Sequence, residues 1–290
     1  MNDAGVLLSN HRRLNNEKVI HLKFVDDLTL CEAIDLQTKL TGKTRDGSAD
    51  SAPYVLSIQQ TEMNKQLQDI SKYAIENDMK VNYSKTKIMK FNPCKSLEFD
   101  VNMSMDGHTL ENVEESKLLG IVVRSDLKWS SNTMNMIKKA NKRLWLIRRL
   151  KNLGTCEADL LDIYTQQVRS LLEFAVPVWQ SSLTASDKID IERVQKSACH
   201  VILGSEYESY SKALETLCLE TLETRRIKLC LNFALSCEKN EKFKSWFVPN
   251  LKRTNTRQKN SKYLEAWTNH ARLENSPICY LIKLLNTYYK

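Results

Sequence analysis

The chain has 290 residues and a formal net charge of +8, with 42% hydrophobic and 27% charged residues. These proportions are typical of a globular protein that is long enough to form two or three packed units. No apolar run reaches the roughly 18 to 20 residues that span a bilayer, and the N-terminus lacks a signal-peptide pattern, so we expect an intracellular protein of the nucleus or cytoplasm, without a membrane partner and not secreted.

Residues 19 to 35 contain two apolar runs on either side of an adjacent pair of aspartates, Asp26 and Asp27. Runs of this length, rich in Val, Ile, Leu and Phe, predict buried strands, and a hairpin between them would carry both carboxylates at its tip. Exposed carboxylate oxygens on a rigid support are suitable ligands for Mg²⁺, and phosphoryl transfer is the natural chemistry of such a site. The alternative is ordinary turn chemistry, in which Asp side chains bond their own backbone.

The segment Phe24-Val25-Asp26-Asp27-Leu28-Thr29-Leu30 resembles the Phe-x-Asp-Asp box in the palm of reverse transcriptases, most closely those of non-LTR retrotransposons. The resemblance implies RNA-directed DNA synthesis, with Asp26 and Asp27 as catalytic Mg²⁺ ligands. It also implies an RNA template and a DNA primer as partners. Further segments that resemble the same family follow in order along the chain.

Residues 36 to 60 are polar, include Gly42, Gly47 and Pro53, and predict a surface loop. Thr61 is a suitable N-cap, and the apolar residues after it recur at helical spacing to about Met79. This pattern predicts an amphipathic helix that covers one face of a sheet.

Residues 81 to 91 resemble the next palm motif, in which Asn precedes Lys-Thr-Lys and a strand. The resemblance implies a lysine near the nucleotide phosphates, where its charge would favour transfer, and Lys85 is the candidate catalytic residue. The alternative is a solvated lysine in a turn before an edge strand, because Lys87 and Lys90 lie nearby.

Asp106-Gly107 lies between short apolar runs and predicts a hairpin turn. The residues from Lys117 to Val123 predict a single buried strand that contains Gly120. They resemble the primer-grip hairpin of the family, which implies nucleic-acid contacts at Lys117 and at Gly120, where a Leu-Gly step lets the nucleic-acid backbone approach closely. A structural bulge at the glycine is the competing interpretation.

Residues 130 to 152 show the spacing of an amphipathic helix. Its apolar face consists of Ile137, Ala140, Leu144 and Ile147. Its opposite face consists of Lys138, Lys142 and Arg149. From residue 127 to residue 156 there are eight Lys or Arg and no Asp or Glu, which favours contact with nucleic-acid phosphates over a merely solvated basic face. In the resemblance, this helix begins the thumb that holds template and primer.

The remaining residues are mostly helical by pattern. Helices are predicted over residues 157–174, 186–203 and, as a pair, 211–239, with a closing helix after Ser276. The segment from Leu172 to Trp179 resembles the region after the polymerase core in the same family, and Phe174 and Trp179 are predicted to belong to the hydrophobic core. Residues 240 to 275 predict a polar, basic connection, and the scattered cysteines predict buried free thiols rather than a zinc site.

Together these patterns predict an α+β fold: an incomplete antiparallel palm sheet with a packed helix (residues 1–125), a thumb-like helical domain (126–205), and a C-terminal helical region with a basic linker (206–290). In the family, fingers and a palm strand with the first catalytic aspartate precede the hairpin, and nothing in this sequence resembles them. Two-metal transfer needs carboxylates from two strands, so we expect the chain to be inactive alone and to use dNTPs only if the missing half is supplied. A non-catalytic nucleic-acid-binding module and a decayed element copy are the alternatives.

Overall fold

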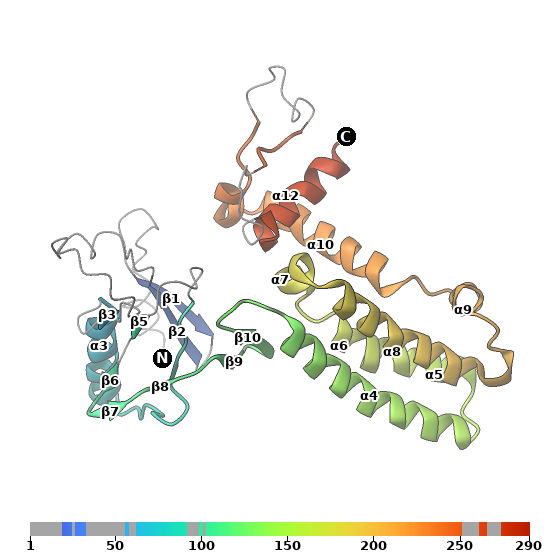
Figure 1. Ribbon diagram of the computed structural model, residues 1–290, viewed down its shortest axis with the longest axis horizontal. Helices are drawn as coiled ribbons and strands as arrows, with labels where there is room; N and C mark the ends of the chain where they lie inside the picture. Colours follow the sequence, from blue (N-terminus) through green and yellow to red (C-terminus); the bar gives the residue numbers. More distant parts are fainter. Residues whose placement is uncertain are drawn as a thin grey trace, which may run out of the picture. The chain divides into compact units, whose positions relative to one another are not determined.

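The computed structural model describes residues 19–24, 27–32, 56–57, 62–91, 99–100, 103–250, 261–265 and 274–290. These residues form a mixed α/β structure that is predominantly helical and contains a few small sheets (Figure 1). The chain divides into two compact units, Met1–Ser116 and Lys117–Lys290. In the part of the chain that is described, every helix is too short or too polar to cross a lipid bilayer.

The first described element of the N-terminal unit is a β-hairpin at the predicted position. Strand β1 (Val19–Phe24) pairs antiparallel with β2 (Asp27–Glu32), from Val19 opposite Glu32 to Phe24 opposite Asp27. The two apolar runs therefore form strands, as their composition predicts. The residues between the strands, 25 and 26, lie outside the described part of the chain.

Helix α3 (Glu62–Glu76) confirms the helix predicted after residue 61. Its buried face presents Leu67 to a small core that also contains Met103, Met105 and Leu110. The helix ends before Met79, because the chain turns through a left-handed residue and the Met79 N–H donates to a carbonyl of the last helical turn over 2.8 Å. Of the predicted surface loop at 36–60, only β3 (Leu56–Ser57) lies within the described residues, and residue 61 lies outside them.

The other strands of this unit are only two residues long. Strand β3 pairs parallel with β5 (Phe99–Asp100), β4 (Lys87–Ile88) pairs parallel with β8 (Glu111–Asn112), and β6 (Ser104–Met105) pairs antiparallel with β7 (His108–Thr109). The described strands of the whole chain thus form five separate two-stranded sheets.

The Asp-Gly signal does mark a hairpin turn. Asp106 and Gly107 connect β6 to β7 with φ values of 51° and 79°, and two left-handed residues in succession match the twist of an antiparallel pair. The Asp106 carboxylate accepts hydrogen bonds from the Ser71 hydroxyl of α3 over 2.5 Å and from the Tyr83 hydroxyl over 2.7 Å. These bonds tie the hairpin to the helix.

The predicted single buried strand over residues 117–123 is wrong. The structure has two paired strands there, β9 (Glu115–Leu118) and β10 (Ile121–Arg124). Leu119 and Gly120 connect them, with φ values of 46° and 89°. Glycine favours such a conformation, and here it redirects the chain instead of continuing a strand. Leu118, Leu119 and Gly120 are exposed, whereas Val122 is buried.

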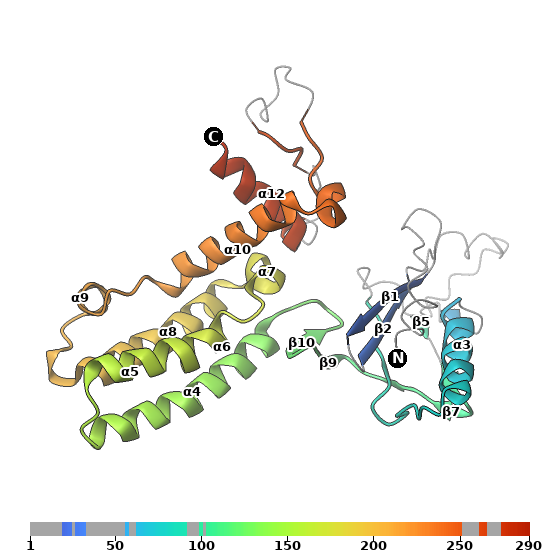
Figure 2. The same cartoon turned by 180° about the vertical axis from the view of Figure 1, so that it is seen from behind.

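The helices of the C-terminal unit follow the predicted spans closely. They are α4 (Ser130–Asn152), α5 (Glu157–Ile163), the π-helical η1 (Tyr164–Arg169), α6 (Ser170–Leu172), α7 (Val176–Trp179), η2 (Gln180–Ser182), α8 (Ala185–Leu203), η3 (Gly204–Glu206), α9 (Tyr210–Thr216), α10 (Leu222–Lys239), η4 (Glu241–Trp246) and α12 (Pro277–Tyr288). In Figures 1 and 2, α4, α5, α6 and α8 lie side by side, and α10 contacts α12. One core joins these elements, so the residues predicted as a thumb-like domain and as a C-terminal region pack together.

The two aromatic residues predicted for this core have different environments. Trp179 is fully buried, as expected, but Phe174 keeps 52% of its surface exposed, so its assignment to the core is wrong. Ala175, between them, has a φ of 52° and reverses the chain direction. The Trp179 indole N–H then donates to the Phe174 carbonyl over 2.9 Å. The turn places one ring inside and leaves the other at the surface.

The connection predicted over residues 240–275 contains ordered structure in its described parts. Phe247 and Tyr263 are buried in the common core, and an isolated antiparallel bridge joins Pro249 to Tyr263. Residues 251–260 and 266–273 lie outside the described part of the chain. The closing helix is confirmed as α12, whose first turn is capped by the Ser276 hydroxyl.

The described cysteines are all free thiols, but they are not all buried as predicted. Cys199, Cys230, Cys237 and Cys279 are buried, and Cys31, Cys156 and Cys218 are exposed.

Candidate nucleic-acid interface

The structure describes only part of the predicted metal site. Asp27 begins β2 and pairs with Phe24, so it is the strand residue next to the reversal. Asp26 lies outside the described residues. Within the described residues, no group of three or more His, Cys, Asp or Glu side chains is arranged to hold a metal ion. The expectation of Mg²⁺ ligands at this hairpin therefore stays a prediction.

Lys85 lies in a turn between α3 and β4. Its side chain is exposed, and its backbone N–H donates to the Asn82 side-chain oxygen over 3.1 Å. The neighbouring Lys87 is paired with Glu111. Lys85 is thus a solvent-accessible cation in the turn that precedes β4, a position compatible with either of the two roles considered for it.

Lys117 and Gly120 lie on the β9–β10 hairpin, where Lys117 is exposed and Gly120 forms the second position of the turn. A Cβ atom at Gly120 would lie 3.2 Å from Cε1 of Phe174. The glycine thus combines a left-handed conformation with close approach of an aromatic ring. The predicted bulge is not present, because the glycine lies between two strands rather than within one.

The predicted basic face of α4 is present, and the predicted apolar face is buried except for Ile137, which is half-buried and lines the groove described below. Ala140, Leu144 and Ile147 are fully buried. Lys138, Lys142 and Arg149 are exposed. Two further cations of this helix serve its packing: Arg143 donates to the Gln167 carbonyl over 2.5 Å, and Lys151 donates to the Ile202 carbonyl over 2.7 Å.

The sequence did not indicate that a second helix adds cations beside this face. A groove of about 920 Å³ lies between α4 and α8. It is lined by Met134, Ile137, Lys138, Asn141, Lys142, Trp145, Arg148, Asp190, Arg193, Val194 and Ser197. A hollow of about 330 Å³ shares Arg148, Arg193 and Ser197 with it. That hollow is otherwise lined by Lys196, His200, Val201 and Tyr207.

The exposed tryptophan of α4 was also missed. Trp145 interrupts the basic run of the helix and keeps 57% of its surface exposed, with the Arg149 guanidinium 5.5 Å from its ring centre. A large aromatic residue beside Arg and Lys at helical spacing is a signal that could have been noted from the sequence.

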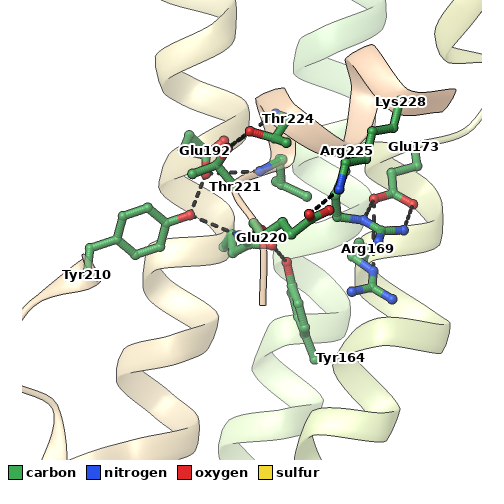
Figure 3. A network of polar contacts seen from close by, with 12 residues as sticks. Tyr164, Arg169, Glu173, Glu192, Tyr210, Glu220, Thr221, Thr224, Arg225 and Lys228 are labelled. Atoms are coloured by element: carbon green, nitrogen blue, oxygen red, sulfur yellow. Dashed lines mark hydrogen bonds and ion pairs between the residues drawn. The ribbon is translucent and has the colours of Figure 1, made fainter. Parts of the chain in front are cut away.

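A buried polar network fixes α8 against its neighbours (Figure 3). The fully buried Tyr164 of the π-helix donates to the Gln195 side-chain oxygen over 2.6 Å. The Gln195 amide donates to the Tyr210 hydroxyl and to the Glu220 carbonyl, each over 2.9 Å. Tyr210 in turn donates to Glu192, and burial raises the pKa of both tyrosines, so they remain neutral donors at physiological pH.

An ion-pair cluster lies beside this network in Figure 3. The Arg225 guanidinium of α10 holds both carboxylate oxygens of Glu173, one of them over 3.0 Å, and Arg169 approaches the same carboxylate at 3.9 Å. Lys228 pairs with Glu220. These groups satisfy one another within the fold. We therefore assign the cluster to the support of α8 and α10 and not to a catalytic site.

Comparison with known protein families, with curated proteins and with solved structures found no match to this chain.

Proposed function

We propose that the chain is the C-terminal half of a reverse transcriptase of non-LTR retrotransposon type, comprising part of the palm, the thumb and a helical C-terminal region. Its chemistry would be RNA-templated DNA synthesis. Its partners would be an RNA template and a DNA primer, held in part by Lys117, Lys138, Lys142 and Arg149.

The observation that carries the proposal is the register of the β1–β2 hairpin. Phe24 pairs with Asp27, so the Phe-x-Asp-Asp sequence spans the end of an antiparallel pair, which is the setting that the resemblance requires. A slip of one residue in this register would exchange the faces of every side chain in the strand. The order of later elements, a helix, a Leu-Gly hairpin and then a basic helix, adds support.

Asp26 and Asp27 would hold Mg²⁺ in this proposal, and Lys85 would lie near the nucleotide phosphates. Bound Mg²⁺ would stabilise charge on the transferring phosphoryl group. Both aspartates belong to one hairpin, whereas two-metal transfer draws carboxylates from more than one strand. The chain alone is therefore expected not to extend a primer.

The second candidate function is a nucleic-acid-binding module without metal chemistry. It is favoured by the exposed Lys138, Lys142 and nearby Arg148, for which the described residues provide no carboxylate partner. Cations that lack internal partners are available to phosphates, and this property does not depend on the aspartates.

A salt titration tests whether α4 contacts nucleic acid, which both candidate functions require. The full chain is mixed with a fluorescent RNA template annealed to a DNA primer, and binding is measured by anisotropy at several salt concentrations. Replacement of Lys138, Lys142 and Arg149 by Gln should lower the slope of log affinity against log salt by roughly 0.7 to 0.9 for each lost phosphate contact. A control with the same change in charge replaces the exposed Lys239, Lys242 and Lys290. Equal slopes for the two variants would show that these α4 cations do not contact nucleic-acid phosphates.

A second experiment separates the two candidates. Fe²⁺ bound in place of Mg²⁺ reduces added hydrogen peroxide to hydroxide and a hydroxyl radical, becoming Fe³⁺, and the radical cuts the polypeptide close to the ion. The polymerase-type proposal predicts cleavage near residue 26 that disappears in Asp26→Asn and Asp27→Asn but persists in Asp106→Asn. Absence of local cleavage in the unaltered chain, with nucleic-acid binding intact, would leave the non-catalytic module. Primer extension by the chain alone that is abolished by Asp26→Ala would instead contradict the expected inactivity.

A further inference from the structure

The groove between α4 and α8 differs from a simple basic helix face because it has two walls that are held in place. At one end the Ser130 hydroxyl of α4 lies 3.3 Å from the Asp187 carboxylate of α8, and at the other Lys151 donates to the Ile202 carbonyl over 2.7 Å. The two helices therefore run in the same direction, and they lie side by side in both Figure 1 and Figure 2. A ligand would meet a preformed surface, which reduces the ordering cost of binding.

The charge of the groove is strongly positive. Its lining and that of the adjoining hollow carry the cations Lys138, Lys142, Arg148, Arg193 and Lys196. Asp190 is the one carboxylate in the two linings, and it lies 2.5 Å from Arg193. Four cations thus remain uncompensated by an acid of the lining. The partner that such a surface attracts is a polyanion.

The groove also offers an exposed aromatic ring among these cations. Trp145 lines it, with more than half of its surface exposed, and Tyr207 lines the adjoining hollow. An exposed indole is unfavourable in water and unnecessary for binding phosphates alone. A basic groove with aromatic rings is the arrangement by which proteins bind single-stranded nucleic acids, because unpaired bases stack on the rings while cations follow the backbone.

The dimensions permit a short strand. Met134 and Arg148, at the two ends of the α4 wall, are separated by about 21 Å at the 1.5 Å helical rise per residue. At about 3.4 Å per stacked nucleotide, this length accommodates roughly six nucleotides.

We propose that the α4–α8 groove and the adjoining hollow bind a single-stranded segment of nucleic acid, with a base stacked on Trp145 in the groove and phosphates contacted by Arg148 and, in the hollow, by Lys196. The inference rests on the proposed function in that the partner is a nucleic acid. It goes further by assigning the strandedness, the second wall on α8 and the stacking residue. At Trp145 a paired duplex is disfavoured because its bases already stack on one another, so the groove would take an unpaired part of the nucleic acid; an acidic peptide is disfavoured because it would leave the indole without a stacking partner.

The test uses the full chain and a fluorescent oligo(dT) or oligo(U) of about 12 nucleotides, which spans the groove with nucleotides to spare. Trp145→Ala should weaken binding of either oligonucleotide about five-fold or more, whereas Trp145→Phe should retain most of the affinity. Tyr288→Ala removes an exposed aromatic residue outside the groove and should have no effect. Thermal unfolding should be unchanged in all three variants, because the replaced rings are exposed.

The cations are tested separately on the same oligonucleotides. Arg148→Gln and Lys196→Gln, one on each wall, should each lower the slope of log affinity against log salt by about 0.7, and Lys239→Gln should not. A self-complementary DNA duplex and polyglutamate serve as alternative ligands. Tighter binding of either one than of oligo(dT), or an unchanged affinity in Trp145→Ala, would overturn the inference.

The failure of this inference is distinguishable from that of the proposed function. A chain that binds no template–primer at any salt concentration would defeat both. If the chain binds template–primer through Lys138, Lys142 and Arg149, but Trp145→Ala and Lys196→Gln leave its affinity for single strands unchanged, only the inference about the groove is refuted.

Discussion

The hydrogen bond between Tyr164 and Gln195 gives the sharpest test of the C-terminal unit. Both side chains are fully buried, and the tyrosine hydroxyl lies 2.6 Å from the glutamine oxygen. Tyr164→Phe removes the donor, Gln195→Met removes the acceptor while keeping an unbranched side chain, and the double variant removes both. The three variants form a double-mutant cycle around one bond.

The expected magnitudes follow from what each variant leaves unpaired. Tyr164→Phe leaves the Gln195 oxygen without its donor and should cost about 1 to 2 kcal/mol. Gln195→Met strands the buried Tyr164 hydroxyl and also removes the bonds to Tyr210 and to the Glu220 carbonyl, so it should cost about 3 to 4 kcal/mol. The double variant no longer strands the tyrosine hydroxyl. Its cost should fall below the sum of the single costs by about 1 to 2 kcal/mol.

The assay is urea unfolding followed by far-ultraviolet circular dichroism at pH 7, where the helical signal arises mainly from the C-terminal unit. The free energies of unfolding of the four proteins give the coupling energy directly. Costs that add exactly, or a double variant less stable than the sum predicts, would refute the assigned bond. The same result would undermine the view that this network holds α8 in position as the second wall of the groove.

Gly120→Ala should destabilise the chain by about 1 to 2 kcal/mol, because φ is +89° and the new methyl group would lie close to Phe174. Gly154→Ala is the matched control, because φ is +86° there but the space around the glycine is open. Chemical denaturation should show a smaller loss of stability for Gly154→Ala than for Gly120→Ala. Burial raises the pKa of the Cys230 thiol to about 12, so at pH 8 it should react with a thiol reagent far more slowly than the exposed Cys156 and Cys218. Labelling of Cys230 in the folded chain as fast as that of the exposed cysteines would contradict its buried position. Hydrogen bonds from two hydroxyl groups lower the pKa of Asp106, so its stabilising contribution is present above the pKa of an unfolded aspartate and is lost as the pH falls through the lowered value. Asp106→Asn preserves the left-handed turn but removes the titrating carboxylate. In hydrogen exchange, the protection of the β6–β7 amides should therefore depend less on pH in the acidic range. An unchanged pH profile would show that the carboxylate does not cause this dependence.

Local sequence patterns are sufficient to predict a structural feature when that feature belongs to a single helix or turn. The span of α4 and its two faces follow from helical spacing, since every turn repeats the same division between Leu144 or Ile147 inside and Lys138 or Lys142 outside. The β6–β7 turn follows from Asp-Gly, because few residue pairs accept two left-handed conformations in succession.

Apolar composition gives a wrong prediction of burial where the chain reverses direction within an apolar run. The run that contains Leu118 and Leu119 was predicted as one buried strand, but its Leu-Gly step turns the chain and exposes both leucines. Phe174 was assigned to the core together with Trp179, but the left-handed Ala175 separates them. A left-handed alanine such as Ala175 has no clear local signature, because the surrounding contacts and not its own preference hold it there.

The sequence by itself determined the helical spans, the apolar hairpin runs that flank Asp27, and the excess of cations on α4. Only the tertiary structure decided that α8 lies alongside α4, so that Arg193 joins Lys138 and Trp145 around one groove and Lys196 lines the hollow beside it. The physical reason is range: periodicity and turn preferences act over a few residues, whereas this groove depends on hydrogen bonds and core packing between segments about fifty residues apart in the chain.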